Sequence, residues 1–121
     1  MNNRNDKAPP APEVDVRWHE EGVAVVSLAG EHDLGNADAL QTLLDQTLER
    51  SNHLIVDLSD AEFIDSWIVQ TLVTTRRRAE TEHRQFNLVL GTSEIVERVL
   101  TITDVLPYLN RTHTLEDALG S

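Results

Sequence analysis

The sequence has no cysteine, and among its 121 residues there are only five glycines and four prolines. Without cysteine the chain forms no disulfide, zinc–thiolate site or iron–sulfur cluster and performs no thiol chemistry. No apolar run approaches the roughly 20 residues that span a bilayer. Residues 1–12 are polar and proline-rich, so they lack the apolar segment of a secretory signal. We therefore expect a cytoplasmic protein.

Basic residues are also scarce, with 10 Lys and Arg against 21 Asp and Glu, for a formal net charge of -11. Duplex nucleic acid and anionic lipid are bound by basic surfaces, so we expect neither nucleic acid nor a membrane as a partner. A basic protein partner would complement this charge. The simpler alternative is that the negative charge only keeps a small protein soluble.

The motifs of cofactor and metal chemistry are missing as well. The sequence contains no Gly-x-Ser-x-Gly elbow and no phosphate-binding loop. Its histidines stand singly, without metal-ligand spacing, at His19, His32, His53, His83 and His113. We expect no cofactor, no metal and no enzymatic activity. Asp33, beside His32 at the end of a strand, is expected to close the turn and cap the next helix.

Hydrophobic periodicity predicts one α/β domain over residues 13–121, preceded by a disordered tail over 1–12. The predicted order is ββαβαβα, followed by a short strand and a short helix, which implies parallel crossovers. The predicted elements are strands at 14–19 and 23–29 with a turn at Gly22, a helix capped by Asn36, a strand at 53–58, a loop at 59–65, a helix from about Ser66, a strand at 86–90 stopped by Gly91, a helix capped by Ser93, a strand at 109–112 and a helix capped by Thr114.

The most informative segment runs from the predicted strand at 53–58 into Asp65-Ser66 at the start of a helix. Free amides at a helix N-terminus favour a negative charge, so a hydroxyl placed there could accept a phosphoryl group. Alternatively, Ser66 is only an N-cap. Trp67 either packs inward or is an exposed anchor for a partner. The run Arg76–Arg78 is read as a solvated helix face rather than an anion site.

Three segments resemble the STAS domain, and specifically the bacterial anti-sigma factor antagonists. They are Leu28-Ala29-Gly30-Glu31-His32-Asp33, then Leu54-Ile55-Val56-Asp57-Leu58 followed by Phe63-Ile64-Asp65-Ser66, and finally Thr114-Leu115-Glu116-Asp117-Ala118-Leu119. The resemblance covers residues 14–119. It implies a STAS-type mixed central sheet of four to five strands, with helices packed mainly on one face.

The resemblance also implies a regulatory function. An antagonist of this family binds an anti-sigma factor, typically a serine kinase, and thereby releases a sigma factor. The kinase switches the antagonist off by phosphorylation, here at Ser66, and a phosphatase resets it. The expected partner-binding residues are Asp33, Asp65, Ser66, Trp67, Thr92 and Ser93. We expect a monomer or a weak homodimer.

The sequence departs from the family at four positions. His32 stands where the family usually has an apolar residue. Trp67 and Ile68 stand where a small residue and glycine usually follow the serine, and Asp104 stands where glycine usually follows the third helix. Two other functions stay open. One is a STAS scaffold subunit, without phosphoregulation, of a sensory complex or a lipid transporter. The other is a small acyl- or phosphoryl-transfer enzyme that uses Ser66.

Overall fold

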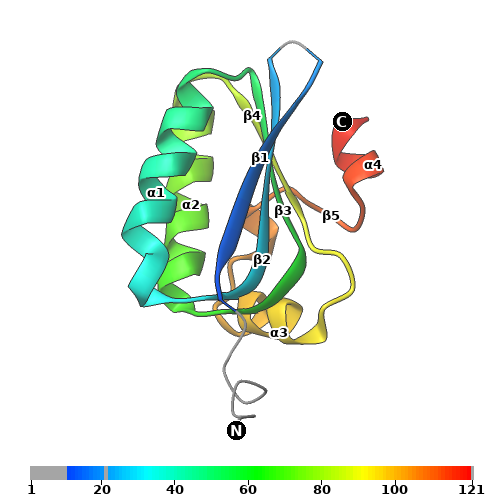
Figure 1. Ribbon diagram of the computed structural model, residues 1–121. Helices are drawn as coiled ribbons and strands as arrows, with labels where there is room; N and C mark the ends of the chain where they lie inside the picture. Colours follow the sequence, from blue (N-terminus) through cyan, green and yellow to red (C-terminus); the bar gives the residue numbers. More distant parts are fainter. Residues whose placement is uncertain (1–10, 21, 121) are drawn as a thin grey trace, which may run out of the picture.

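The computed structural model describes residues 11–20 and 22–120 (Figure 1). The elements are β1 (Glu13–His19), β2 (Val23–His32), α1 (Leu34–Glu49), β3 (His53–Ile64), α2 (Ser66–Thr81), β4 (Gln85–Val89), α3 (Glu94–Ile102), a 3₁₀ turn (Leu106–Tyr108), β5 (Arg111–Thr112) and α4 (Leu115–Leu119). The predicted order of strands and helices is confirmed. Most of the predicted tail, residues 1–10, lies outside the described residues.

The strands form a single mixed sheet in the order β1-β2-β3-β4-β5. β1 and β2 make the predicted antiparallel hairpin, and the other neighbouring pairs are parallel. Gly91, two residues after the end of β4, has φ +68, and a Cβ atom there would lie 2.8 Å from the Cα of Ser59. Only glycine fits at this crossing of two backbones. The predicted α/β fold with a four- to five-stranded mixed sheet is confirmed.

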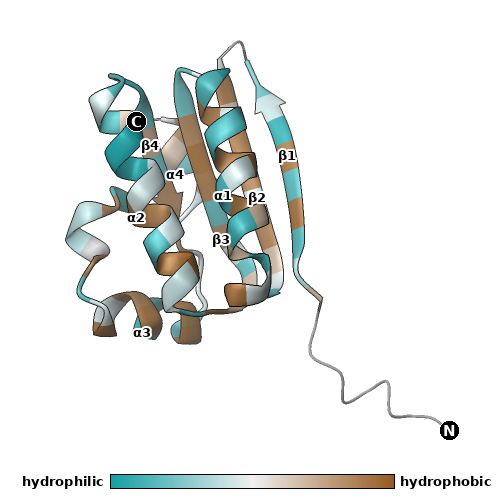
Figure 2. Cartoon of the chain, turned by 90° about the vertical axis from the view of Figure 1, so that its left-hand side faces the viewer, coloured by the Kyte–Doolittle hydropathy of each residue, from teal (hydrophilic) through white to brown (hydrophobic). Residues whose placement is uncertain are grey.

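The two faces of the sheet are covered unequally. α1 and α2 lie side by side over one face, and α4 lies on the other (Figures 1 and 2). The larger core lies on the first face and includes Ala24, Val26, Leu28, Leu54, Val56, Leu58, Leu40, Leu44, Leu48, Ile68, Leu72, Val96 and Leu100. A smaller cluster of Val25, Ile55, Val89 and Ala118 lies beneath α4. The helices therefore pack mainly on one face, as expected.

Several predicted boundaries are wrong. The strand expected at 23–29 extends over Val23–His32, and the strand expected at 109–112 covers only Arg111–Thr112. The loop expected at 59–65 is mostly strand, because β3 continues to Ile64 beside β2, which runs on to His32. Register shifts in this pairing interrupt the alternation of buried and exposed side chains, and so hide the strand in the sequence. α1 begins at Leu34, so Asn36 is the third residue of the helix and not its N-cap.

Ion pairs connect the C-terminal ends of α1 and α2. Arg78 on α2 bonds Glu49 on α1 at 2.8 Å and Glu82 at 2.7 Å, and lies 3.3 Å from Asp45 on α1. Arg78 is thus held by carboxylates rather than being freely solvated, whereas Arg77 is exposed. None of the helices in the described part of the chain has the length and apolarity needed to cross a membrane.

Candidate functional site

One carboxylate joins the first turns of α1 and α2. Asp65 is the N-cap of α2, and its Oδ1 accepts hydrogen bonds from the backbone N–H of Trp67 at 3.0 Å and of Ile68 at 3.1 Å. Its Oδ2 accepts from the backbone N–H of Leu34, the first residue of α1, at 3.0 Å. The starts of the two helices, 31 residues apart in sequence, are therefore fixed next to each other.

Asp33 caps α1, as predicted. Its Oδ1 accepts from the Gly35 N–H at 2.8 Å, and the Asn36 side chain accepts from the Asp33 N–H at 2.9 Å, which completes a capping box. The Asn36 amide also lies 2.7 Å from Nδ1 of His32, whose Nε2 lies 2.8 Å from the Ala29 carbonyl oxygen. A carbonyl oxygen can only accept, so Nε2 donates to it, and the Asn36 amide N–H₂ group donates to Nδ1. His32 is a buried structural residue.

Ser66 is exposed as the first residue of α2, and Asp65, not Ser66, is the N-cap. Trp67 is also exposed, with 55% of its surface accessible. The alternative in which Trp67 packs into the core is therefore wrong. Leu34 is 59% exposed at the start of α1, and Phe63 is 37% exposed at the end of β3. Sequence reasoning missed Leu34 because it placed the helix start at Asn36; the Asp33–Asn36 capping-box spacing was the available signal.

The amides at the start of α2 are less available than the sequence suggested. Asp65 Oδ1 already accepts from Trp67 and Ile68, and the Asp65 carbonyl oxygen accepts from the Val69 N–H at 3.1 Å. We expected backbone N–H groups at this helix end to be free to bind an anion. That expectation is wrong for the N–H groups of Trp67, Ile68 and Val69, because each already has an acceptor. A phosphate on Ser66 would lie beside the Asp65 carboxylate instead.

Thr92 and Ser93 lie on a different segment, between β4 and α3. Thr92 is exposed, and the Ser93 hydroxyl caps α3 by accepting from the Val96 N–H at 3.3 Å, as predicted. Within residues 11–20 and 22–120, no hydrogen bond joins either residue to Asp65, Ser66 or Trp67. The structure therefore places Asp33, Asp65, Ser66 and Trp67 at the joined starts of α1 and α2, and Thr92 and Ser93 on the loop that precedes α3.

A family model of the STAS domain matches residues 16–118, nearly the whole chain. The chain belongs to the STAS domain family. No curated protein matches it in sequence. This STAS domain is similar to solved structures of anti-sigma factor antagonists. One, from Mycobacterium paratuberculosis, is 29% identical with a TM-score of 0.84, over 93% of this chain and 95% of that one.

The fold is also shared with the Bacillus cell fate determinant SpoIIAA, an anti-sigma factor antagonist. Its unphosphorylated form is 18% identical with a TM-score of 0.75, over 88% of this chain and 93% of that one. Its phosphorylated form is 17% identical with a TM-score of 0.69, over 89% and 97%. At these identities the likeness concerns the fold alone.

The structure explains two of the departures from the family pattern. Ile68 is fully buried in the larger core, so its bulk does not reach the surface around Ser66. Asp104 has φ +59 and adopts the left-handed conformation that glycine usually provides. Trp67 is the departure that changes the exposed surface next to Ser66.

Proposed function

We propose that this STAS domain protein is an anti-sigma factor antagonist, whose binding to an anti-sigma factor is switched off by phosphorylation of Ser66. The observation that carries the proposal is the exposed Ser66 hydroxyl at the first residue of α2, with exposed Trp67 next to it. The family and the similarity to the mycobacterial antagonist support the role. In this role the protein acts in the cytoplasm as a regulator and catalyses no reaction.

The partner in this proposal is a serine kinase that is itself the anti-sigma factor. It binds the unphosphorylated antagonist, which frees the sigma factor, and it then phosphorylates Ser66 and is released. A phosphatase resets the cycle. One solved structure that shares the fold is a phosphorylated antagonist. The proposed contact surface comprises Asp33, Asp65, Ser66 and Trp67, with Thr92 and Ser93 on the neighbouring loop.

The local structure gives this switch a physical basis. Trp67 and Leu34 provide apolar area that a partner can bury, close to a hydroxyl that carries no charge. A phosphate adds about −1.5 to −2 charges at neutral pH. It would lie beside Asp65, in a chain whose net charge is already -11, so burying it against a partner costs desolvation and repulsion. A coupling of about 1–3 kcal/mol changes affinity about 5- to 150-fold.

The test compares Ser66→Ala with Ser66→Asp by titration calorimetry against the cognate kinase. We expect Ser66→Ala to bind as the unmodified protein does and Ser66→Asp to bind at least about fivefold more weakly. Thr74→Asp is the matched control, since Thr74 is exposed on the same helix and the variant adds the same charge. Equal affinities of both Ser66 variants, or an equal loss in the control, would remove Ser66 from the switch.

Trp67→Ala separates binding from folding in the same assay. Because Trp67 is 55% exposed, we expect the Trp67→Ala variant to unfold at nearly the same thermal midpoint as the unmodified protein. An exposed tryptophan that anchors an interface typically costs more than about 1 kcal/mol when truncated, which is at least about a fivefold loss in affinity. Unchanged affinity would exclude Trp67 from the contact surface, and a large loss of thermal stability would give it a structural role.

A further inference from the structure

The outer edge of β1 is an open strand edge. β1 is the first strand in the sheet order and pairs with β2 alone, so its other edge has no partner strand in the described part of the chain. Figure 2 shows β1 standing apart from α1 and α2 at this side of the molecule. The strand has seven residues and contains neither proline nor glycine. A straight edge of this length is a template for pairing with another strand.

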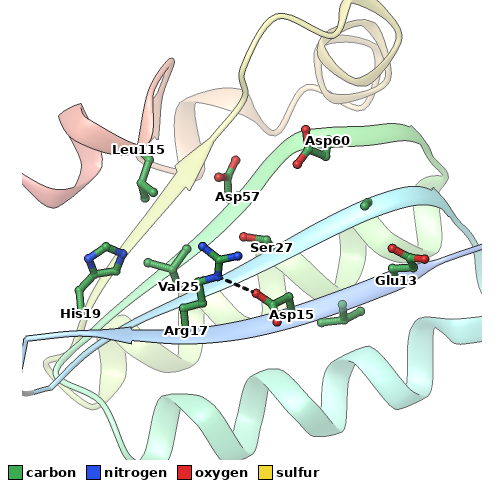
Figure 3. Close-up of a pocket in the computed structure, with 11 residues that line it drawn as sticks. Glu13, Asp15, Arg17, His19, Val25, Ser27, Asp57, Asp60 and Leu115 are labelled. Carbon is green, nitrogen blue, oxygen red and sulfur yellow. Dashed lines mark hydrogen bonds and ion pairs between the residues drawn. The ribbon is translucent and has the colours of Figure 1, made fainter.

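The side chains of β1 are sorted by face. Charged and titratable residues occupy alternate positions and line an open groove of about 790 Å³ on the face away from α1 (Figure 3). Within that face, Arg17 Nε lies 3.0 Å from Asp15 Oδ2. Val14, Val16 and Trp18 occupy the other positions, and Val14 is 38% and Trp18 44% exposed. The guanidinium of Arg50, the residue that follows α1, lies 5.7 Å from the ring centre of Trp18.

This sequence is complementary to itself when it is read in the opposite direction. If two copies of β1 pair antiparallel with Val16 opposite Val16, then Asp15 lies opposite Arg17, Glu13 opposite His19, and Val14 opposite Trp18. Directly opposite residues in an antiparallel pair point to the same face and interact. We propose that this edge is a homodimer interface, in which β1 pairs with β1 of a second copy about a twofold axis through Val16.

The charges select this register over its neighbours. A shift by two residues in one direction places Asp15 opposite Asp15, and a shift in the other direction places Arg17 opposite Arg17. Like charges directly opposite each other destabilise a strand pair. Exposed edges are usually blocked by proline or by charges, especially lysine. In β1 the charges have opposite signs at symmetric positions, so they favour one self-pairing instead of preventing it.

The dimer is compatible with access to Ser66. Glu13, at the start of β1, pairs with Ala29. Ser66 comes two residues after Ile64, which pairs with His32 further along β2. Ser66 therefore lies beyond the paired length of β1. Antiparallel pairing places the two Ser66 residues at opposite ends of a ten-stranded sheet. The proposal does not depend on the proposed function, because it rests on β1 alone. The net charge of -11 per chain opposes association at long range, so the dimer is weak.

The experiment measures self-association of the full chain by sedimentation equilibrium over a concentration series up to about 1 mM, a range that reaches weak dimers. Asp15→Arg and Arg17→Asp each place like charges opposite each other, so we expect each to weaken the dimer at least about tenfold. Mixed in equal amounts, the two variants are complementary and should form a heterodimer. Asp60→Arg controls for the change in total charge in Asp15→Arg, since Asp60 is exposed on β3 and not on β1.

The double variant D15R/R17D keeps the ion pair within the strand and guards against loss of folding in the single variants. We expect it to associate with itself as the unmodified protein does and not to mix with it, because like charges would then oppose each other. A monomer throughout the concentration series would overturn the proposal. So would a dimer that the single substitutions leave unchanged, or single variants that stay monomeric when mixed.

Discussion

Asp65 accepts backbone hydrogen bonds from two helices, and this structural function exists whether or not the residue contacts a partner. Its Oδ1 caps α2, and its Oδ2 accepts a hydrogen bond from the first N–H group of α1. Ser66 projects from the junction that Asp65 fixes. Substitutions of Asp65 will therefore change both stability and the presentation of Ser66, and a binding defect alone would not assign it to the interface.

The two functions of the Asp65 carboxylate can be separated by substitution. Asp65→Ala loses the cap and the bond to Leu34, so we expect a loss of about 1–3 kcal/mol in the free energy of unfolding. Asp65→Asn keeps an oxygen for the cap but sets an N–H₂ group against the Leu34 N–H, and should cost less. Urea unfolding measures both, with Asp60→Asn as the exposed control. Equal losses in the Ala and Asn variants would contradict this division.

At the scale of elements, α1 and α2 are joined at both ends, by Asp65 at their starts and by Arg78 near their ends. The hydrogen bonds that the Arg78 guanidinium donates to Glu49 and then to Glu82 raise the pKa of Arg78, which stays charged. The hydrogen bond from Arg78, and next the one from Arg84, hold the pKa of Glu82 below its ordinary value of 4.5. These ion pairs connect the C-terminal ends of the two helices, whereas Ser66 lies at the N-terminal end of α2.

Glu82 makes this helix pair sensitive to acid. Its folded-state pKa is lowered, so its stabilising contribution is present above pH 4.5 and is lost as the pH falls through the lower folded value. We expect Glu82→Gln to have a lower thermal midpoint than the unmodified protein at pH 7, and the difference to shrink below pH 4.5. Melts at stepped pH measure it, with Glu62→Gln, exposed on β3, as control. A difference that is constant with pH would contradict the ion pairing.

At the scale of the whole molecule, stability and partner binding use separate apolar residues. The larger core lies between the sheet and α1, α2 and α3, and contains fully buried leucines such as Leu58. Leu34, Phe63 and Trp67 stay exposed around Ser66. The outer edge of β1 is separate from both the larger core and the surface around Ser66. Its strand residues contribute little to the core.

The same substitution distinguishes the core from the surface around Ser66. Leu58→Ala empties a fully buried position, so we expect a loss of about 2–5 kcal/mol in the free energy of unfolding. Leu34→Ala removes the same atoms from a side chain that is 59% exposed and should change stability by less than about 0.5 kcal/mol. Urea unfolding measures the free energy of unfolding of both variants, and the comparison holds if their m-values are equal. A similar loss in both would place Leu34 in the core.

Much of the fold was predictable because it depends on local patterns. The run Val23–Ala29 indicated a strand covered on both faces, and Ala24, Val25 and Val26 are all buried. Ser93 and Thr114 were recognisable as caps because a short side chain with an acceptor oxygen bonds the backbone a few residues ahead. The segment 59–64 was missed because its pairing with β2 contains register shifts, which remove the alternation that marks a strand.

The sequence by itself determined the order of the elements, the position of Ser66 at the start of a helix and the negative charge of the chain, because periodicity, caps and composition are properties of neighbouring residues. Only the tertiary structure decided that Asp65 bonds Leu34, that Trp67 is exposed while Ile68 is buried, and that β1 has a free edge. These features depend on contacts between segments far apart in sequence, and such contacts form only when the sheet and helices pack together.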